Sequence, residues 1–280
     1  MQINQYPAIT SISDGDLFMI QSASDGAYKS ISASDLQAYF GGNSSTGGTG
    51  GTGSSDSDNL FSSVVLLLSN NNTVLLDKSS LANSISNSGV LLNSTSKFGA
   101  NSAYFSGGSN IVTIPSRVEF ILGNSDFTIE AWVFPTTLDS NFRHIISKAG
   151  DLSNNSNRSY SLSISTNNIG WYYTTNGISD VTINFPCTLT ANDWHHIAIS
   201  RSNGILCGFL DGILLASVAH TDTYFNSSAG ITIGSFGGYA AQGYPQLSFI
   251  GNIEKDGLRI TKNCRYAASF ALPTKAFPTI

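Results

Sequence analysis

Charge is scarce in this sequence of 280 residues. Asp, Glu, Lys and Arg together make up 11% of it, against about 25% in an average domain. The 13 basic residues are scattered singly, and the formal net charge is −5. Because nucleic acids and anionic membrane surfaces are bound through clusters of Lys and Arg, we expect neither partner. Solubility must come from Ser, Thr, Asn and Gly, a composition typical of β-rich surface and fibre proteins.

Cysteine pairs and long hydrophobic runs are also lacking. The three cysteines, Cys187, Cys207 and Cys264, cannot pair completely and none has a C-x-x-C spacing, so we expect free thiols rather than a disulfide framework or a metal site. The longest aliphatic run, residues 64–68, is far shorter than the roughly 20 residues that span a bilayer. The first residues show no basic stretch followed by an apolar one, so we expect no signal peptide and synthesis in a reducing cytoplasm.

Residues 1–40 form a small patterned unit. Apolar residues at 17–20 and an alternating run at 28–31 flank the turn-forming residues 24–27, which predicts a β-hairpin. Residues 34–37 have the spacing of a helix-capping box, so a short helix is expected next. A hairpin with one short helix cannot hold a self-sufficient core. We therefore expect this unit to bury its apolar face against another copy of itself or against a larger assembly.

The rest of the chain divides into a linker and a β-rich region. Residues 41–59 contain seven glycines and no hydrophobic side chain, which is typical of a flexible linker. Residues 60–280 are a succession of short β-prone runs separated by Gly, Asn, Asp or Ser, which predicts an all-β sandwich or barrel. One hairpin is explicit, since Asp211-Gly212 suits a two-residue turn between strands 206–210 and 213–218.

Three motifs in this region resemble a known family. They lie at residues 126–133 (DFTIEAWV), 192–198 (NDWHHIA) and 208–212 (GFLDG). In this order they resemble laminin-G-like modules, and weaker matches accompany them at 64–68, 97–99, 251–261 and 264–266. The resemblance implies a concanavalin-A-like jelly-roll β-sandwich over residues 60–280. Such modules are common in structural proteins of tailed phages, especially cyanobacterial phages.

The N-terminal unit, residues 1–40, is similar to the short hairpin unit with which many phage fibre and baseplate proteins begin. The match covers ITSISDGDLFMI at 9–20 and YKSISASDL at 28–36. Together the two resemblances imply a virion component, made in the host cytoplasm, whose residues 1–59 contact other virion proteins. A small apolar unit beside a low-charge linker is best buried around an axis, so we expect a homo-oligomer and favour a homotrimer.

Catalysis is not expected. Jelly-roll glucanases carry the pattern E-x-D-x-x-E, which brings two carboxyl groups to about 5.5 Å. The glutamates Glu119, Glu130 and Glu254 are not part of such a pattern, and we expect a structural role for Glu130. Neighbouring strand residues point to opposite faces, so His195 and His196 cannot share a ligand.

Calcium and other cofactors find little support in the sequence. Many laminin-G-like modules hold Ca²⁺ at the rim through loop aspartates and carbonyls, so the resemblance leaves such a site open. Oxygen-bearing side chains in the expected loops are Asp139, Asp151, Asp180 and Asp222, with Asn154 and Asn155 nearby. No dense run of them supplies the six to eight oxygens that Ca²⁺ prefers. We therefore predict no cofactor and assign no metal ligand.

Glycan binding needs aromatic faces for the sugar rings and polar groups for their hydroxyls. The candidates are Trp171, Tyr172, Tyr173, Asn176, Tyr239 and Tyr244. Strand alternation places Trp171 and Tyr173 on one face and Tyr172 on the other. One of these faces can equally be core, with the loop tyrosines packed between subunits.

The resulting prediction is a non-enzymatic phage structural protein, namely a tail fibre, baseplate or capsid-surface adhesin. Its sandwich would bind host-surface glycans, and several linked copies would raise a weak single-site affinity. A purely structural cement or decoration protein is the alternative. A glycoside hydrolase is the third hypothesis, and the sequence lacks the carboxylate pair that it needs.

Overall fold

The computed structural model describes residues 17–21, 28–32, 57–150 and 156–280. The chain divides into two compact units, residues 1–49 and 50–280, and each is described by itself. Within the described ranges, no helix has both the length and the apolar character needed to cross a membrane.

The first unit contains a two-stranded hairpin. Strand β1 (Leu17–Gln21) pairs antiparallel with β2 (Tyr28–Ser32), with Leu17 opposite Ser32 and Gln21 opposite Tyr28. Both strands predicted in this unit are therefore present. The predicted turn at 24–27 and the helix expected from Ser34 lie outside the described residues.

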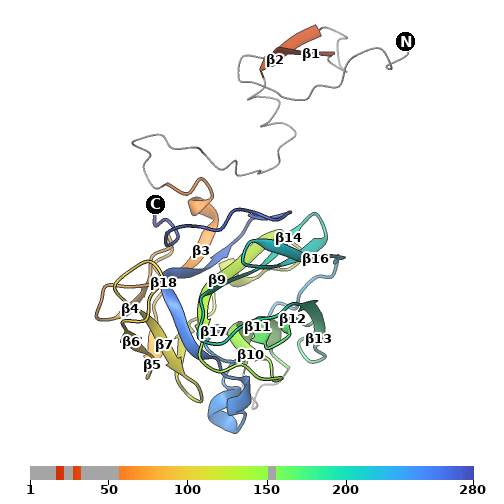
Figure 1. The fold of residues 1–280 in the computed structure, drawn as a ribbon. Helices are drawn as coiled ribbons and strands as arrows, with labels where there is room; N and C mark the ends of the chain where they lie inside the picture. The colour runs from red at the N-terminus through yellow and green to blue at the C-terminus, as the bar shows by residue number, and fades with distance from the viewer. Residues whose placement is uncertain (1–16, 22–27, 33–56, 151–155) are drawn as a thin grey trace. The chain divides into compact units, whose positions relative to one another are not determined.

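The second unit is an all-β sandwich of two antiparallel sheets, as predicted (Figure 1). Its seven-stranded sheet is made of β5 (Ser86–Ser88), β8 (Ile111–Ile114), β10 (Arg143–Ala149), β11 (Arg158–Ser165), β12 (Asn168–Tyr173), β13 (Val181–Pro186) and β17 (Ile231–Ile233). Over the described residues these strands run in the order β13-β12-β11-β10-β17-β8-β5.

The nine-stranded sheet packs on it. It is made of β3 (Val64–Asn70), β4 (Leu75–Asp77), β6 (Leu91–Asn93), β7 (Ser102–Ser106), β9 (Phe127–Pro135), β14 (His195–Ser202), β15 (Ile205–Leu210), β16 (Ile213–Ala219) and β18 (Ile250–Thr261). Its main order, again over the described residues, is β16-β15-β14-β9-β18-β3-β4, with β7 beside β18 and β6 beside β7. Short 3₁₀ helices are η1 (Phe61–Ser63), η2 (Val118–Phe120), η4 (Tyr239–Gln242) and η5 (Pro245–Leu247).

Period-2 alternation builds the core between the sheets. In β9, Phe127, Ile129, Ala131 and Val133 belong to the main hydrophobic core, while the residues between them face the other way. The predicted D-G turn is also present, because Asp211 and Gly212 adopt φ of 49° and 77° between β15 and β16. Strands β4, β5, β6 and β13 have little sequence signal, since three have only three residues and β13 has one buried residue.

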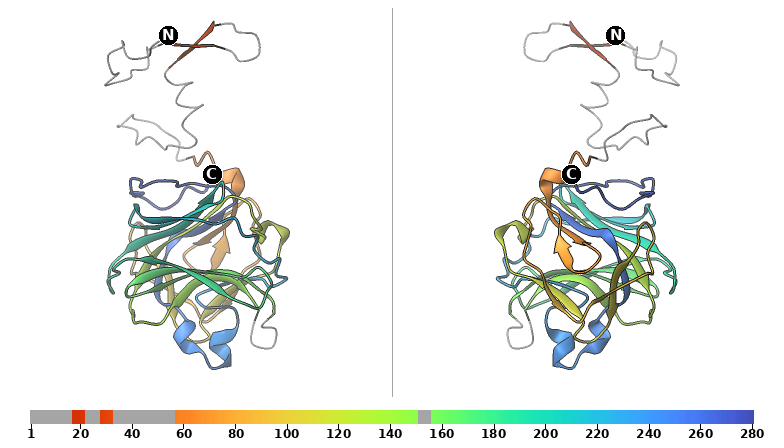
Figure 2. Two further views of the ribbon diagram at one scale, coloured as in Figure 1. Left: turned by 90° about the vertical axis from the view of Figure 1, so that its right-hand side faces the viewer. Right: turned by 90° about the vertical axis from the view of Figure 1, so that its left-hand side faces the viewer.

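The first and last residues of the sandwich lie side by side. The backbone N–H of Asp58 donates to the carbonyl of Ile280 at 2.8 Å. Figures 1 and 2 show these residues on the side of the sandwich opposite to η4 and η5, and η4 and η5 cover the outer face of the seven-stranded sheet.

Candidate functional site

A row of hydroxyl groups crosses the outer face of the seven-stranded sheet. Every strand contributes one residue to it, and each residue is the register partner of the next. This hydroxyl row consists of Ser86, Thr113, Thr232, Ser147, Ser161, Tyr172 and Thr182. Hydroxyls both donate and accept hydrogen bonds, so the row offers paired polar groups without charge.

Alternation explains why these residues point outward. Thr113 lies between Val112 and Ile114, and both neighbours are core residues. Strand β11 shows the same pattern over its length, because Ser159, Ser161, Ser163 and Ser165 alternate with Tyr160, Leu162 and Ile164. The apolar residues bury between the sheets, which leaves the hydroxyls on the outer surface.

Residues 234–249, here called the cap, cover the middle of the hydroxyl row. The Ser147 hydroxyl donates to the carbonyl of Ser235 at 2.9 Å and accepts from the N–H of Gly237 at 2.9 Å. The Arg143 guanidinium donates to the carbonyl of Ser248 at 3.0 Å. These bonds hold the cap to the sheet, so Ser147 is completely buried while the ends of the row are open.

A line of aromatic rings runs from the sheet onto the cap. Neighbouring centroids are 5.4 Å apart for Phe142–Tyr172, 6.5 Å for Tyr172–Phe236, 5.3 Å for Phe236–Tyr239 and 6.0 Å for Tyr239–Tyr244. These five residues are called the ring line, and their spacings are those of interacting aromatic pairs. Tyr244 is 42% exposed, and Phe142 and Tyr172 are half-buried.

Gly170 gives Phe142 its place in the ring line. A Cβ at this position would lie 2.7 Å from Phe142 Cε1 and 2.7 Å from the Ser163 hydroxyl. Both distances are shorter than van der Waals contact allows. The glycine therefore lets the Phe142 ring lie close to the sheet beside Tyr172.

Two titratable groups of the site are uncharged at neutral pH. Burial lowers the pKa of His144 to about 3, and its Nδ1 lies 2.7 Å from the Ser161 hydroxyl. Burial likewise raises the pKa of Tyr172 to about 12, with a smaller contribution from the charge of Asp180 and against a smaller opposing effect of the Thr182 hydroxyl. Both groups are consequently neutral, and the face presents rings and hydroxyls.

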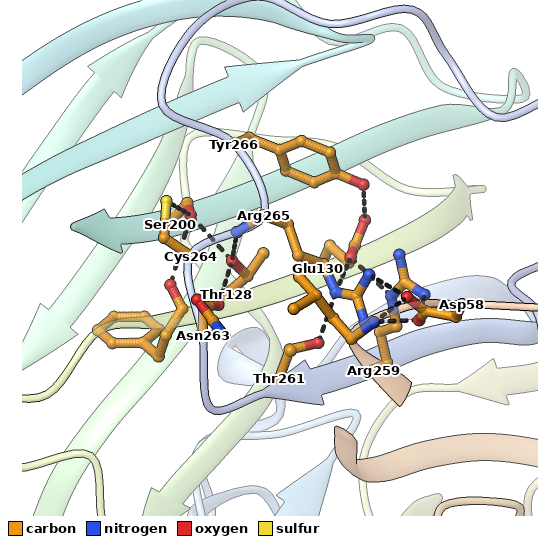
Figure 3. A network of polar contacts seen from close by, with 12 residues as sticks. Asp58, Thr128, Glu130, Ser200, Arg259, Thr261, Asn263, Cys264, Arg265 and Tyr266 are labelled. Atoms are coloured by element: carbon orange, nitrogen blue, oxygen red, sulfur yellow. Dashed lines mark hydrogen bonds and ion pairs between the residues drawn. The ribbon is translucent and has the colours of Figure 1, made fainter. Parts of the chain in front are cut away.

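Charged groups gather instead on the outer face of the nine-stranded sheet (Figure 3). Glu130 accepts from Arg259 Nε at 2.7 Å and from the Tyr266 hydroxyl at 2.9 Å. Asp58 accepts from Arg265 Nη2 at 2.6 Å and from Arg259 Nη1 at 2.9 Å. This ionic network therefore joins Asp58 and Arg265, from the first and last segments of the sandwich, to its central strands β9 and β18.

The network is closed to solvent. Glu130 is completely buried, and the Arg259 guanidinium lies 4.0 Å from the centroid of the Phe277 ring. Burial alone would raise the pKa of Glu130, but Arg259 and the hydrogen bond with His196 outweigh it and hold that pKa far below its usual range. A permanently ionised carboxylate without access to substrate is suited to structure, as predicted for Glu130.

The remaining catalytic candidates also have structural partners. Glu254 accepts from the Ser96 hydroxyl at 2.8 Å and from the Lys97 N–H at 2.6 Å. His195 Nδ1 lies 2.9 Å from Asp211, whereas His196 Nε2 lies 2.9 Å from Glu130. The two imidazoles thus serve different partners, as strand alternation predicts.

Most of the predicted calcium candidates have partners of their own. Asp139 and Asp180 pair with Arg143 and Arg158, and Asp222 accepts from the Tyr173 hydroxyl at 2.6 Å. Asp151, Asn154 and Asn155 lie outside the described residues. In the part of the chain that the structure describes, no group of three or more His, Cys, Asp or Glu is placed to hold a metal ion.

A family model of the concanavalin A-like lectin/glucanases superfamily matches residues 106–253, which is more than half of the chain. The chain belongs to this superfamily. No curated protein sequence matches the chain. The superfamily fold agrees with the two-sheet sandwich, and the matched residues include every member of the hydroxyl row except Ser86 and the whole of the cap.

Solved structures with the same fold include toxin binding domains. The binding domain of Paraclostridial Mosquitocidal Protein 1 aligns with a TM-score of 0.56 and 16% identity over 73% of this chain and 50% of that chain. The Botulinum Neurotoxin Type G receptor binding domain aligns with a TM-score of 0.56 and 19% identity over 74% of this chain and 50% of that chain. A botulinum neurotoxin type C structure aligns with a TM-score of 0.54 and 19% identity over 74% of this chain and 49% of that chain. The chain thus spans about half the length of these proteins, and the likeness concerns the fold.

Within the superfamily sandwich, three of the predicted glycan-binding residues come together. Tyr172, Tyr239 and Tyr244 all belong to the ring line, although Tyr239 is largely buried. Sequence reasoning missed Phe142 and Phe236, which connect them. The serine–apolar alternation of β11 was the available signal for a hydroxyl-bearing outer face.

Trp171 and Tyr173 lie in the core and are corrected as ligand-binding candidates. Trp171 is completely buried and donates from Nε1 to the Tyr224 hydroxyl at 2.9 Å, and Tyr173 is 6% exposed. Both side chains occupy inward-facing positions of β12, so neither ring has a free face for a sugar. Asn176 is exposed, but its Oδ1 accepts from the N–H groups of Ile178 and Ser179 and thereby shapes a turn.

Proposed function

We propose that this protein is a non-enzymatic glycan-binding protein whose site is the outer face of the seven-stranded sheet. The observation that carries the proposal is the ring line lying beside the hydroxyl row. Sugars present apolar C–H faces that stack on aromatic rings, and hydroxyls that pair with hydroxyl side chains. The ring line offers the first kind of contact and the open ends of the hydroxyl row offer the second.

Two further features support a binding role. Glu130 and Glu254 are buried and fully engaged with protein partners, so neither is available as a general acid. The similar type G toxin structure is described as a receptor binding domain, and the type C structure concerns cell entry that depends on interaction with two ganglioside molecules. We extend glycan binding, but no particular glycan, to this chain.

A glycan array with matched variants tests the site. Tyr172→Ala and Tyr244→Ala each remove a ring from the ring line, and we expect binding to weaken about tenfold, equivalent to ~1.4 kcal/mol. Tyr104→Ala is the control, because Tyr104 is a half-buried tyrosine on the outer face of the other sheet. Equal binding by all folded variants would overturn the site. A folded protein that binds no glycan would instead favour the cement or decoration hypothesis.

The absence of catalysis has its own test. Incubation with bound glycans should release no reducing sugar. Release that persists in Glu130→Gln and Glu254→Gln would contradict the proposal, because it would require an acid–base pair outside these two residues.

We further propose that the protein is a phage virion component, a tail fibre, baseplate or capsid-surface adhesin made in the host cytoplasm. Residues 1–40 would attach it to other virion proteins, and residues 41–59 would serve as the linker. The β1–β2 hairpin and the resemblance of its sequence to phage fibre units support this role. Asp58, at the start of the sandwich, bonds to the C-terminal residue Ile280, and Figure 2 shows the C-terminus on the side of the sandwich opposite to η4 and η5, so the proposed glycan site lies away from this start.

A homotrimer is part of this proposal, because three linked sites raise a weak affinity through a high effective concentration. Mass photometry of the complete chain should give about three times the chain mass of 29.6 kDa. A single species at the chain mass at micromolar concentration would overturn the trimer and leave the glycan site untouched.

A further inference from the structure

We propose that a pocket on the far side of the cap, between β5, β8 and β17, binds the terminal residue of a neutral glycan. This inference rests on the proposed glycan-binding function and specifies a second subsite on the same face. The ring line lies over β11, β12 and the cap, whereas this pocket lies toward the opposite edge of the seven-stranded sheet.

The size of the pocket suits one sugar ring. Its volume is about 290 Å³, and Ser86, Thr113, Pro115, Ala149, Gly230 and Thr232 are among its lining residues. Ligand pockets for drug-sized molecules span roughly 300–1,000 Å³, so this one lies at the lower limit. A single ring with its substituents fits that limit better than several linked rings.

The lining matches a neutral, hydroxylated ligand. Ser86, Thr113 and Thr232 are three consecutive members of the hydroxyl row, since Ser86 pairs with Thr113 and Thr113 with Thr232. The threonine methyl groups, Pro115 and Ala149 add apolar surface beside these hydroxyls. Among the described residues that line the pocket, none carries a charge. Carboxylates and phosphates are normally met by charged donors, so an acidic sugar fits this lining poorly.

The cap closes the pocket on one side. Ala149 packs with Phe236 and Tyr239 of the cap, and the next hydroxyl of the row, Ser147, is completely buried. A glycan chain therefore cannot continue along the hydroxyl row past Ala149. On the other side, β5 is an edge strand whose three residues are all exposed. A chain entering over β5 would place its last residue in the pocket.

The floor of the pocket is fixed before any ligand arrives. A Cβ on Gly230 would lie 2.2 Å from the carbonyl oxygen of Ile114, so β17 and β8 approach as closely here as a glycine allows. Backbone this tightly packed has little freedom to collapse into the pocket. A preformed site lowers the ordering cost of binding a small ligand.

Ligand-observed NMR titration with methyl glycosides tests the proposal on the complete chain. The probes are the methyl glycosides of glucose, galactose, rhamnose, N-acetylglucosamine, glucuronic acid and sialic acid. Thr113→Val and Thr232→Val remove one hydroxyl each and keep the side-chain shape, and Ser86→Ala does the same at an exposed position. We expect at least one neutral glycoside to bind the unmodified chain, and each variant to weaken it about tenfold.

The matched control is Ser217→Ala, at an exposed serine of β16, the edge strand of the nine-stranded sheet, which should leave monosaccharide binding unchanged. If Thr113→Val, Thr232→Val and Ser86→Ala all bind glycans normally while Tyr172→Ala does not, the pocket is overturned and the proposed function stands. If the unmodified chain binds no glycan at all, the proposed function fails and the pocket with it.

Two further outcomes concern the ligand class. Preferential binding of glucuronic or sialic acid glycosides through Thr113 and Thr232 would overturn the neutral assignment. Oligosaccharides of two, four and six rings should bind this pocket with affinities equal within about twofold, because only the last ring enters. Affinity that rises steadily with chain length and depends on Thr113 would show an open groove and overturn the terminal-residue assignment.

Discussion

The outer faces of the two sheets use opposite chemistry. On the nine-stranded sheet, Glu130, Asp58, Arg259 and Arg265 form an ionic network that segments from both ends of the sandwich cover. On the seven-stranded sheet, every member of the hydroxyl row is uncharged and both ends of the row are open. A group of the few charged residues thus holds the first and last segments of the sandwich, whereas the hydroxyl row and the ring line of the other face carry no charge.

The physical cost of burial explains this division. A buried charge is tolerated when it is paired and its hydrogen bonds are satisfied, as both carboxylates of the network are. Hydroxyls need no counter-ion, so they can lie open to water and exchange it for a ligand at small cost.

The largest expected effect comes from breaking the network. Glu130→Gln removes one of the two carboxylates that the buried Arg259 guanidinium binds and leaves Asp58 as the other, and we expect a loss of about 3–5 kcal/mol in unfolding free energy. Urea denaturation measures it. Glu119→Gln is the control, since Glu119 forms an exposed pair with Arg117 and should change stability by less than about 1 kcal/mol. Similar losses in the two variants would contradict a structural role for the network.

The neutral face should be sensitive to acid. Burial lowers the pKa of His144 to about 3 from the ordinary 6.5, so the unfolded chain takes up this proton at a higher pH than the folded one. Stability from the neutral imidazole is present above about pH 6.5 and is lost as the pH falls toward 3. Between about pH 7 and pH 5 the loss should reach ~2 kcal/mol.

His144→Phe isolates this contribution, because it keeps an aromatic ring under the cap and removes the titrating group. The variant should lose less unfolding free energy than the unmodified protein over the same pH range. The comparison between the two proteins is needed because His195, whose pKa its hydrogen bond with Asp211 raises, acts in the opposite direction. Equal pH dependence in both proteins would show that His144 does not exclude the proton.

Much of the fold follows from local sequence, and much of the site does not. Alternating apolar residues and the Asp211-Gly212 turn predict strands and a sandwich, and the ordered motifs indicate the family. The hydroxyl row depends on register between distant strands, for example Ser86 with Thr113 and Thr113 with Thr232. Register is set by the packing of the whole sheet, so no local pattern reveals which hydroxyls become neighbours.

The ring line illustrates a second limit. Period-2 alternation correctly separates Tyr172 from Trp171 and Tyr173, but it does not say which face is buried. That choice depends on which side the other sheet covers. The cap adds Phe236 to the ring line from a segment more than sixty residues after Tyr172 in sequence. The cap has no periodic sequence pattern that predicts where it folds.

A smaller effect is expected from moving one ring. In Gly170→Ala the new methyl group would displace Phe142, because both Phe142 and the Ser163 hydroxyl lie 2.7 Å from its position. We expect glycan binding to weaken about threefold to tenfold and stability to fall by about 1–2 kcal/mol through overpacking. Gly99→Ala is the control, since its Cβ would have neighbours no nearer than 3.7 Å. Unchanged glycan binding in Gly170→Ala would remove Phe142 from the site.

The smallest effect is expected from salt, and it separates the two faces directly. Added salt screens exposed charges strongly, with a Debye length of about 10 Å at 0.1 M and about 3 Å at 1 M. A glycan held by the ring line and the hydroxyl row meets no charge from either, so its affinity should change by less than about twofold over that range. Titration of one array-identified neutral glycan at several NaCl concentrations measures this. A steep fall in affinity would mean that charged side chains bind the ligand, and would move the site away from the neutral face.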